Sequence, residues 1–91
     1  MDYTLYILAC ADGTLYTGIA RDAERRAAEH NGATGKGARY TASRRPVRIV
    51  YRAAFASRSE ALREEIRIKR LTRAQKDTLI AEAAATVAAA S

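Results

Sequence analysis

The sequence contains few of the residues that stabilise small proteins through disulfides or metal sites. Among its 91 residues there are one cysteine, one histidine, one proline and no tryptophan. A single cysteine excludes an internal disulfide framework, and Cys10 with His30 cannot supply the roughly four ligands of a structural zinc site. There is no basic-then-apolar leader and no apolar run near the roughly 20 residues that cross a bilayer. We therefore expect a cytoplasmic protein without membrane contact or structural metal.

What the sequence has in excess is positive charge, and this charge is concentrated. The net charge is +6, and between His30 and Ser59 there are seven basic residues and no acidic one. The rest of the chain carries nine basic against ten acidic residues. Such a segment is typical of a site for a polyanion, with a basic surface that binds nothing as the alternative. Thirteen of the bases are arginine, whose planar fork suits phosphate and favours nucleic acid.

The first third of the chain predicts a β-hairpin. Residues 2–9 and 14–19 are rich in aromatic and aliphatic side chains, and the turn-forming ADG separates them. The hairpin has Tyr6 on one arm and Tyr16 on the other, and simple cross-strand packing of the two rings is the alternative to a functional role. We expect Gly18 to end the second strand.

Three helices are predicted from their start signals. Asp22 can cap a helix over 23–30, which Asn-Gly then ends. The stretches SRSE at 57–60 and TRAQ at 72–75 match the capping box, so further helices begin directly after each hydroxyl residue.

The segment between the first two helices predicts a basic loop and a third strand. Residues 32–46 are rich in glycine and small polar residues and lack an apolar period. Residues 47–56 alternate apolar side chains with Arg48 and Arg52, which predicts a strand with one solvent-facing side.

The predicted order is β-β-α-β-α-α, which indicates an α+β fold: a small three-stranded, mainly antiparallel sheet flanked by helices. One domain is expected over residues 1–80. Residues 81–91 are expected to form an alanine-rich helix end or tail.

A carboxylate is predicted on the apolar side of the helix after Ser57. Ala61, Ile68 and Leu71 share one stripe, and Glu64 lies in it. A charge that faces a core is costly without a partner, so Glu64 is either paired with an arginine at the rim or is a metal ligand or acid/base group. Its neighbour Glu65 is less informative, because it lies about 100° round the helix.

Together these residues resemble the GIY-YIG nuclease domain. TLY at 4–6 stands where the family has Gly-Ile-Tyr, and YTG at 16–18 stands where it has Tyr-Ile-Gly. Arg26 lies ten residues after the second tyrosine, like the family's catalytic arginine, and His30 follows one turn later, where members carry histidine or tyrosine. Glu64 precedes IK in a run that resembles the segment with the family's metal-binding glutamate. The chain looks most like the short stand-alone members of the YhbQ type.

The resemblance implies a metal-dependent endonuclease that hydrolyses DNA, with a preference for structure over sequence, in repair or recombination. One Mg²⁺ or Mn²⁺ ion would be held by Glu64, and Arg26 would clamp the scissile phosphate. Tyr6, alone or through Tyr16, would orient and deprotonate the attacking water, which requires either that Arg26 and the metal lower the tyrosine pKa or that the tyrosine relays the proton onward. His30 would relay protons or contact phosphate.

Nucleic-acid contacts are expected in and around the basic loop. The candidate residues are Lys36, Arg39, Tyr40, Arg44, Arg45 and Arg48. They would bind the phosphate backbone and carry little sequence information. RNA in place of DNA, a binding protein that cleaves poorly, and a module whose specificity comes from a protein partner are the alternatives, and the oligomeric state is left open.

Overall fold

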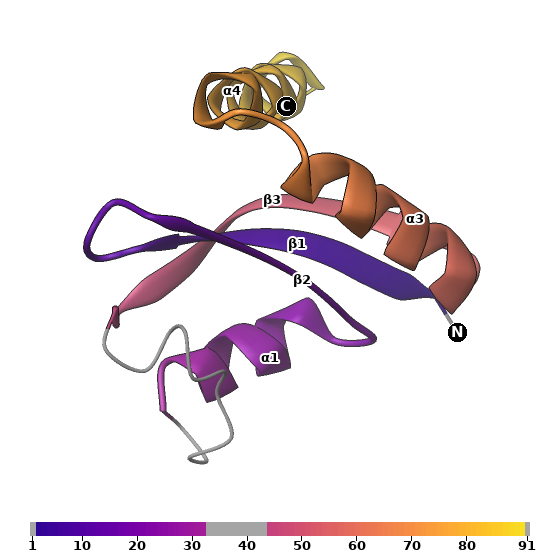
Figure 1. Cartoon of the computed structure of the whole chain (residues 1–91), viewed down its shortest axis with the longest axis horizontal. Coiled ribbons are helices and arrows are strands. Elements are labelled where there is room, and N and C mark those ends of the chain that lie inside the picture. The colour runs from indigo at the N-terminus through magenta and orange to yellow at the C-terminus, as the bar shows by residue number, and fades with distance from the viewer. Residues whose placement is uncertain (1, 33–43, 91) are drawn as a thin grey trace.

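The computed structural model describes residues 2–32 and 44–90, and this part has the predicted element order. Strands β1 (Tyr3–Cys10), β2 (Leu15–Ala20) and β3 (Val47–Phe55) form an antiparallel sheet in the order β2-β1-β3. Helix α1 (Ala23–His30) covers one face, and α3 (Arg58–Lys69) and α4 (Arg73–Ala90) lie on the other (Figure 1). The α+β class is confirmed.

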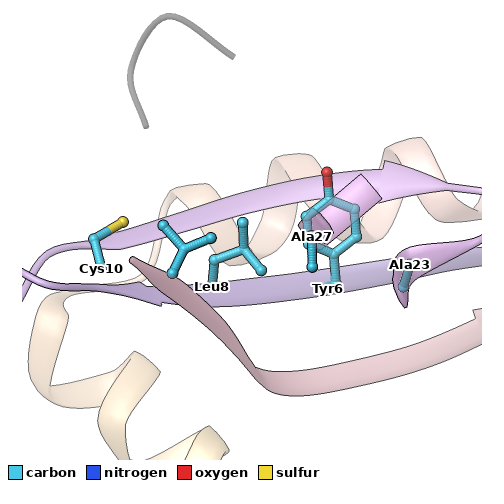
Figure 2. Close-up of a cluster of buried hydrophobic side chains, with 6 residues drawn as sticks. Tyr6, Leu8, Cys10, Ala23 and Ala27 are labelled. Atoms are coloured by element: carbon cyan, nitrogen blue, oxygen red, sulfur yellow. The ribbon is translucent and has the colours of Figure 1, made fainter. Parts of the chain in front are cut away.

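The central strand β1 separates two cores. Its Leu5 and Ile7 are fully buried with Ile68 of α3, in a core of aliphatic and aromatic side chains. Tyr6 and Leu8 point to the other face, where they pack with the alanines of α1 (Figure 2). Because both faces are covered, β1 reads as a continuous apolar run, and each buried leucine or isoleucine contributes about 1.5 to 3 kcal/mol relative to exposure.

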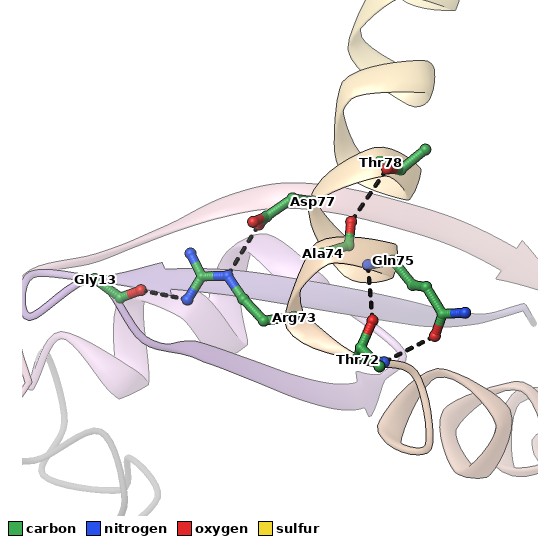
Figure 3. A network of polar contacts seen from close by, with 7 residues as sticks. All are labelled: Gly13, Thr72, Arg73, Ala74, Gln75, Asp77 and Thr78. Atoms are coloured by element: carbon green, nitrogen blue, oxygen red, sulfur yellow. Dashed lines mark hydrogen bonds and ion pairs between the residues drawn. The ribbon is translucent and has the colours of Figure 1, made fainter.

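The predicted helix starts are confirmed. The Asp22 carboxylate accepts from a backbone N–H in the first turn of α1 at 3.0 Å, and the Ser57 hydroxyl does the same for α3 at 3.2 Å. Before α4, the Gln75 side chain accepts from the Thr72 backbone N–H at 2.9 Å and the Thr72 hydroxyl accepts from the Gln75 N–H at 3.1 Å (Figure 3). These bonds satisfy N–H groups that have no partner within the helix.

Helix α4 is joined to the turn between β1 and β2. Arg73 donates to the Gly13 carbonyl at 2.7 Å and pairs with Asp77 at 2.9 Å (Figure 3). Leu79 and Ile80 pack against the core on the α3 side. The helix continues to Ala90, so the alanine-rich segment is helical through that residue.

The prediction that β3 has one solvent-facing side is wrong, because the strand contains a β-bulge. Consecutive residues of β1 pair with Tyr51 and Ile49, which leaves Val50 unpaired. The extra residue switches the faces, so Ile49 packs on the α1 side and Tyr51 on the α3 side. Arg48 and Arg52 therefore project to opposite faces of the sheet.

Candidate active site

Two tyrosines and the histidine meet on the α1 side of the sheet. The Tyr6 hydroxyl and His30 Nε2 are hydrogen-bonded at 3.1 Å, and the His30 side chain has no exposed surface. The Tyr16 ring lies edge-on to the imidazole, with centroids 5.0 Å apart. In the strand register Tyr6 is opposite Gly18, so the two tyrosines are diagonal neighbours. Both tyrosines contact His30, so the pair is more than a cross-strand packing contact.

Gly18 provides space for the Tyr6 ring. The prediction that this glycine ends β2 is wrong, since the strand continues to Ala20. The ring extends from β1 toward β2 (Figure 2), and a β-carbon at Gly18 would lie 2.6 Å from the Tyr6 hydroxyl oxygen. A side chain at this position would push the hydroxyl away from His30, so close approach is the reason for glycine here.

Arg26 lies at the more exposed end of the same cluster. Its Nη1 donates to a Glu29 carboxylate oxygen at 3.2 Å, and its guanidinium also hydrogen-bonds to Tyr6. The Arg26 side chain is 31% exposed, against 15% for Glu29. A planar guanidinium held in this way has a fixed orientation, which suits the geometry of a phosphate.

The surroundings keep both proton-carrying groups of the cluster neutral near pH 7. Burial, with a smaller contribution from Tyr16, raises the pKa of Tyr6 to about 12, although Arg26 acts in the opposite direction. Burial also lowers the pKa of His30, and the charges of Arg26 and Arg45 add to this effect. Of the two routes expected for Tyr6, the lowered pKa is therefore not found, because the shift has the opposite sign, and the proton relay is the route that the protonation states allow.

Glu64 faces β3 and not the tyrosine cluster. Its carboxylate is paired with Arg67 on the next turn of α3. Together with burial, its charge raises the pKa of Tyr51, which lies on β3. The structure thus places Glu64 in the contact expected of a rim carboxylate.

The neighbouring Glu65 is the carboxylate that acts on Tyr6. Its charge raises the Tyr6 pKa, its side chain is 17% exposed, and Lys69 lies 3.8 Å away. The sequence contains a signal for this position: Ala61, Glu65 and Ile68 follow the i, i+4, i+7 spacing, and the two apolar members are fully buried. Glu65 lies only about 40° from Ala61 round the helix.

Two of the predicted nucleic-acid-binding residues, Arg44 and Arg45, make contacts within the fold. Arg44 pairs with Asp12 of the β1–β2 turn at 3.0 Å, and the Arg45 Nε donates to the His30 carbonyl at 2.6 Å, at the end of α1. Arg48 is exposed. The remaining candidates lie outside the described residues: Lys36, Arg39 and Tyr40.

A row of three exposed arginines runs along α3 to the residue that caps its C-terminal end. Arg63, Arg67 and Arg70 follow the i, i+4, i+7 spacing and are exposed. The row was not predicted, because the acidic residues of the same helix cancel its charge in the sequence count. Arg67 of this row is paired with Glu64, so the row is not separated from the acidic residues of the helix.

The family follows from a comparison with known proteins. The model of the GIY-YIG catalytic domain matches residues 2–78. The chain belongs to the GIY-YIG family. The match spans every strand and the two helices that carry the candidate site, so this GIY-YIG domain comes from a nuclease family and its members act on nucleic acid.

The similar proteins are short, stand-alone GIY-YIG proteins of the YhbQ type, which carry the name UPF0213. A UPF0213 protein of Halobacterium salinarum is 52% identical over 75 residues, which cover 82% of this chain and 95% of that protein. One from Desulfotalea psychrophila is 55% identical over 76 residues, covering 84% and 68% of the two chains. The solution structure of a UPF0213 protein from Bacillus halodurans has a TM-score of 0.57 at 46% identity and covers 89% of this chain and 84% of that one. The solution structure of the protein EF2693 from E. faecalis has a TM-score of 0.62 at 39% identity and covers 90% of this chain and 85% of that one.

In residues 2–32 and 44–90, no three His, Cys, Asp or Glu side chains are grouped so that they could hold a metal ion together. Across the same ranges, no helix has both the length and the apolar character of a membrane span.

Proposed function

We propose that this GIY-YIG domain is a metal-dependent endonuclease that hydrolyses phosphodiester bonds in DNA. We further propose that it selects DNA by structure and acts in repair or recombination in the cytoplasm. The observation that carries the proposal is the contact of Tyr6 with both His30 and Arg26. The Tyr6 hydroxyl thus contacts both His30, a buried group that can take up a proton, and Arg26, a cation that can bind a phosphate.

The residues fit one Mg²⁺ or Mn²⁺ ion that keeps most of its water. Magnesium binds oxygen ligands and is commonly held by one or two carboxylates with several waters. Glu65 supplies one such carboxylate, partly buried and acting on Tyr6. We therefore assign the ion to Glu65, while Glu64, the ligand expected from the sequence, is engaged by Arg67. When bound, the ion supplies Lewis-acid stabilisation of the leaving oxygen.

The reaction needs a proton acceptor for the attacking water, and the proposed acceptor is a relay. In the tautomer with its proton on Nδ1, His30 accepts from the Tyr6 hydroxyl at Nε2. As the water gives a proton to the Tyr6 oxygen, the phenolic proton passes to His30, so no free phenolate forms. A relay suits a tyrosine whose pKa is raised to about 12. It also suits a histidine with no exposed surface for a phosphate to contact.

Arg26 is the proposed phosphate clamp. Its 31% exposure leaves the guanidinium accessible from solvent while Glu29 and Tyr6 hold it. Donors fixed in this way stabilise the charge that develops on the phosphate in the transition state. Backbone contacts would come from Arg48 and from the arginine row of α3, and they would weaken with salt.

A second candidate function is nucleic-acid binding without efficient cleavage. The raised pKa of Tyr6 favours this alternative, because the phenol stays neutral and is a poor base by itself. RNA as the substrate, or a protein partner that supplies specificity, would appear as outcomes of the same experiment.

The test is cleavage of branched, nicked and single-stranded DNA, with matched RNA, in the presence of Mg²⁺ or Mn²⁺. Arg26→Ala and Glu65→Ala should each reduce the cleavage rate by about 100-fold or more. Glu64→Ala is the matched control, one residue away on α3, and should cleave at close to the wild-type rate. Binding without cleavage by the wild type would support the second candidate, and equal rates for all variants would contradict the assigned site.

A further inference from the structure

Glu29 is a carboxylate with little exposed surface that the sequence did not point to. Its side chain is 15% exposed, on the same helix as Arg26 and His30. A charge with so little contact with water is unfavourable unless a partner compensates it. Its partner is Arg26, at 3.2 Å. Each member of this part-buried pair therefore compensates the charge of the other.

The pair gives the Arg26 guanidinium two anchors. One is the Glu29 carboxylate, and the other is the Tyr6 hydroxyl. A long arginine side chain without such contacts occupies many rotamers, and ordering it into one of them to bind a phosphate costs conformational entropy. With Glu29 on one side and Tyr6 on the other, the planar guanidinium has its orientation fixed.

The charges around His30 give Glu29 a second effect. The groups that face the imidazole are Tyr6 of β1, Tyr16 of β2, Arg26 and Glu29 of α1, and Arg45 before β3. Arg26 and Arg45 disfavour a proton on the ring. Among the described residues that act on His30, Glu29 is the group whose charge favours that proton and raises the pKa.

We propose that Glu29 is a positioning residue, which holds Arg26 against Tyr6 and supplies the negative charge that allows His30 to take up a proton. The inference rests on the proposed function, since both effects serve phosphodiester cleavage. It adds a residue that touches neither the substrate nor the metal and acts through Arg26 and His30.

The first test is the titration of His30, which is the single histidine of the chain and gives one imidazole signal by NMR. Glu29→Gln keeps a hydrogen-bond acceptor for Arg26 and removes the charge, so His30 should titrate at a lower pH than in the wild type. Glu24→Gln is the matched control: it lies on the same helix and also pairs with an arginine, Arg52, at 2.5 Å, but at an exposed position. This control should leave the titration unchanged. The proposal is overturned if Glu29→Gln titrates like the wild type.

The second test separates positioning from charge by the pH profile of cleavage. Glu29→Ala removes both effects and should lower kcat by about tenfold, whereas Glu29→Gln should retain more activity and move the acidic limb of the profile to lower pH. In an Arg26→Ala background Glu29→Ala should have little further effect on kcat. Full additivity of the two substitutions would contradict the positioning role. If the wild type does not cleave at all, the proposed function fails, and the His30 titration still decides the inference about Glu29.

Discussion

The two faces of the sheet are built on different principles, although β1 supplies alternate residues to both. On the α3 side, Leu5 and Ile7 pack with Ile68 in a core held by apolar contact. On the α1 side, the buried positions include a phenol and an imidazole. Burying polar groups gives less stability than burying aliphatic ones and demands partners for each group. We interpret the first face as the main support of the fold, although its helix α3 also carries the proposed metal ligand Glu65, and the second as the face that holds the phenol, the imidazole and Arg26.

The largest expected effect on stability comes from the α3 side. Ile7→Ala removes a fully buried side chain and should lower the free energy of unfolding by about 2 to 5 kcal/mol, measured by urea denaturation. Cleavage per folded molecule should stay at the wild-type level. A loss of specific activity in the folded fraction would mean that the two faces are not independent.

Gly18 tests how closely the α1 side of the sheet is packed. A β-carbon here would lie 2.6 Å from the Tyr6 hydroxyl oxygen, so Gly18→Ala should destabilise the fold by about 1 to 3 kcal/mol and reduce cleavage. In a Tyr6→Phe background part of that destabilisation should disappear, since the nearest atom is gone. The measurement is a double-mutant cycle from denaturation curves. Equal costs in the two backgrounds would contradict the proposed contact.

The α1 side should also respond to pH. His30 has its pKa below 6.5 in the folded state, so its contribution to stability is complete above pH 6.5 and is lost as the pH falls below that value. Tyr6 behaves in the opposite sense: its contribution is complete below pH 10 and is lost as the pH rises toward 12. Denaturation of the wild type and of His30→Gln between pH 5 and 8 checks the first limb. The stability difference between them should change only on the acidic side, and a parallel dependence would contradict the account.

The smallest expected effect concerns the arginine row of α3. Arg63→Gln should reduce the slope of log affinity for duplex DNA against log salt by about 0.9, the value for one lost phosphate contact. Arg58→Gln is the control, about 140° round the same helix. Identical slopes for the two variants would remove the arginine row from the proposed interface.

The elements of the fold could be predicted because local signals specify them. The side chains of Asp22, Ser57 and Thr72 each accept the backbone hydrogen bond that their capping position predicts. The bulge at Val50 could not be predicted, because a one-residue shift is decided by the pairing of β3 with β1 and not by the strand's own pattern. The same shift sends Arg52 to α1, where it pairs with Glu24 at 2.5 Å.

The residues of the candidate site could be predicted from the sequence better than their geometry. The resemblance to the GIY-YIG family brought Tyr6 and His30 into one group, but their burial, which sets their protonation, depends on packing from several elements. The choice between Glu64 and Glu65 depends on which side of α3 faces the sheet, and both lie near the apolar stripe of the helix. Arg45 was predicted as a phosphate contact from its charge, whereas its bond to the His30 carbonyl is a tertiary contact that composition does not encode.

The central claim is that the phenol on the α1 side carries out chemistry and does not serve packing alone. Its most direct test is the rate of branched-DNA cleavage by Tyr6→Phe at saturating Mg²⁺, expressed per folded molecule. We predict a fall of about 100-fold or more, because the substitution keeps the ring and removes the hydroxyl that links the water to His30. Cleavage at the wild-type rate by this variant would contradict the account.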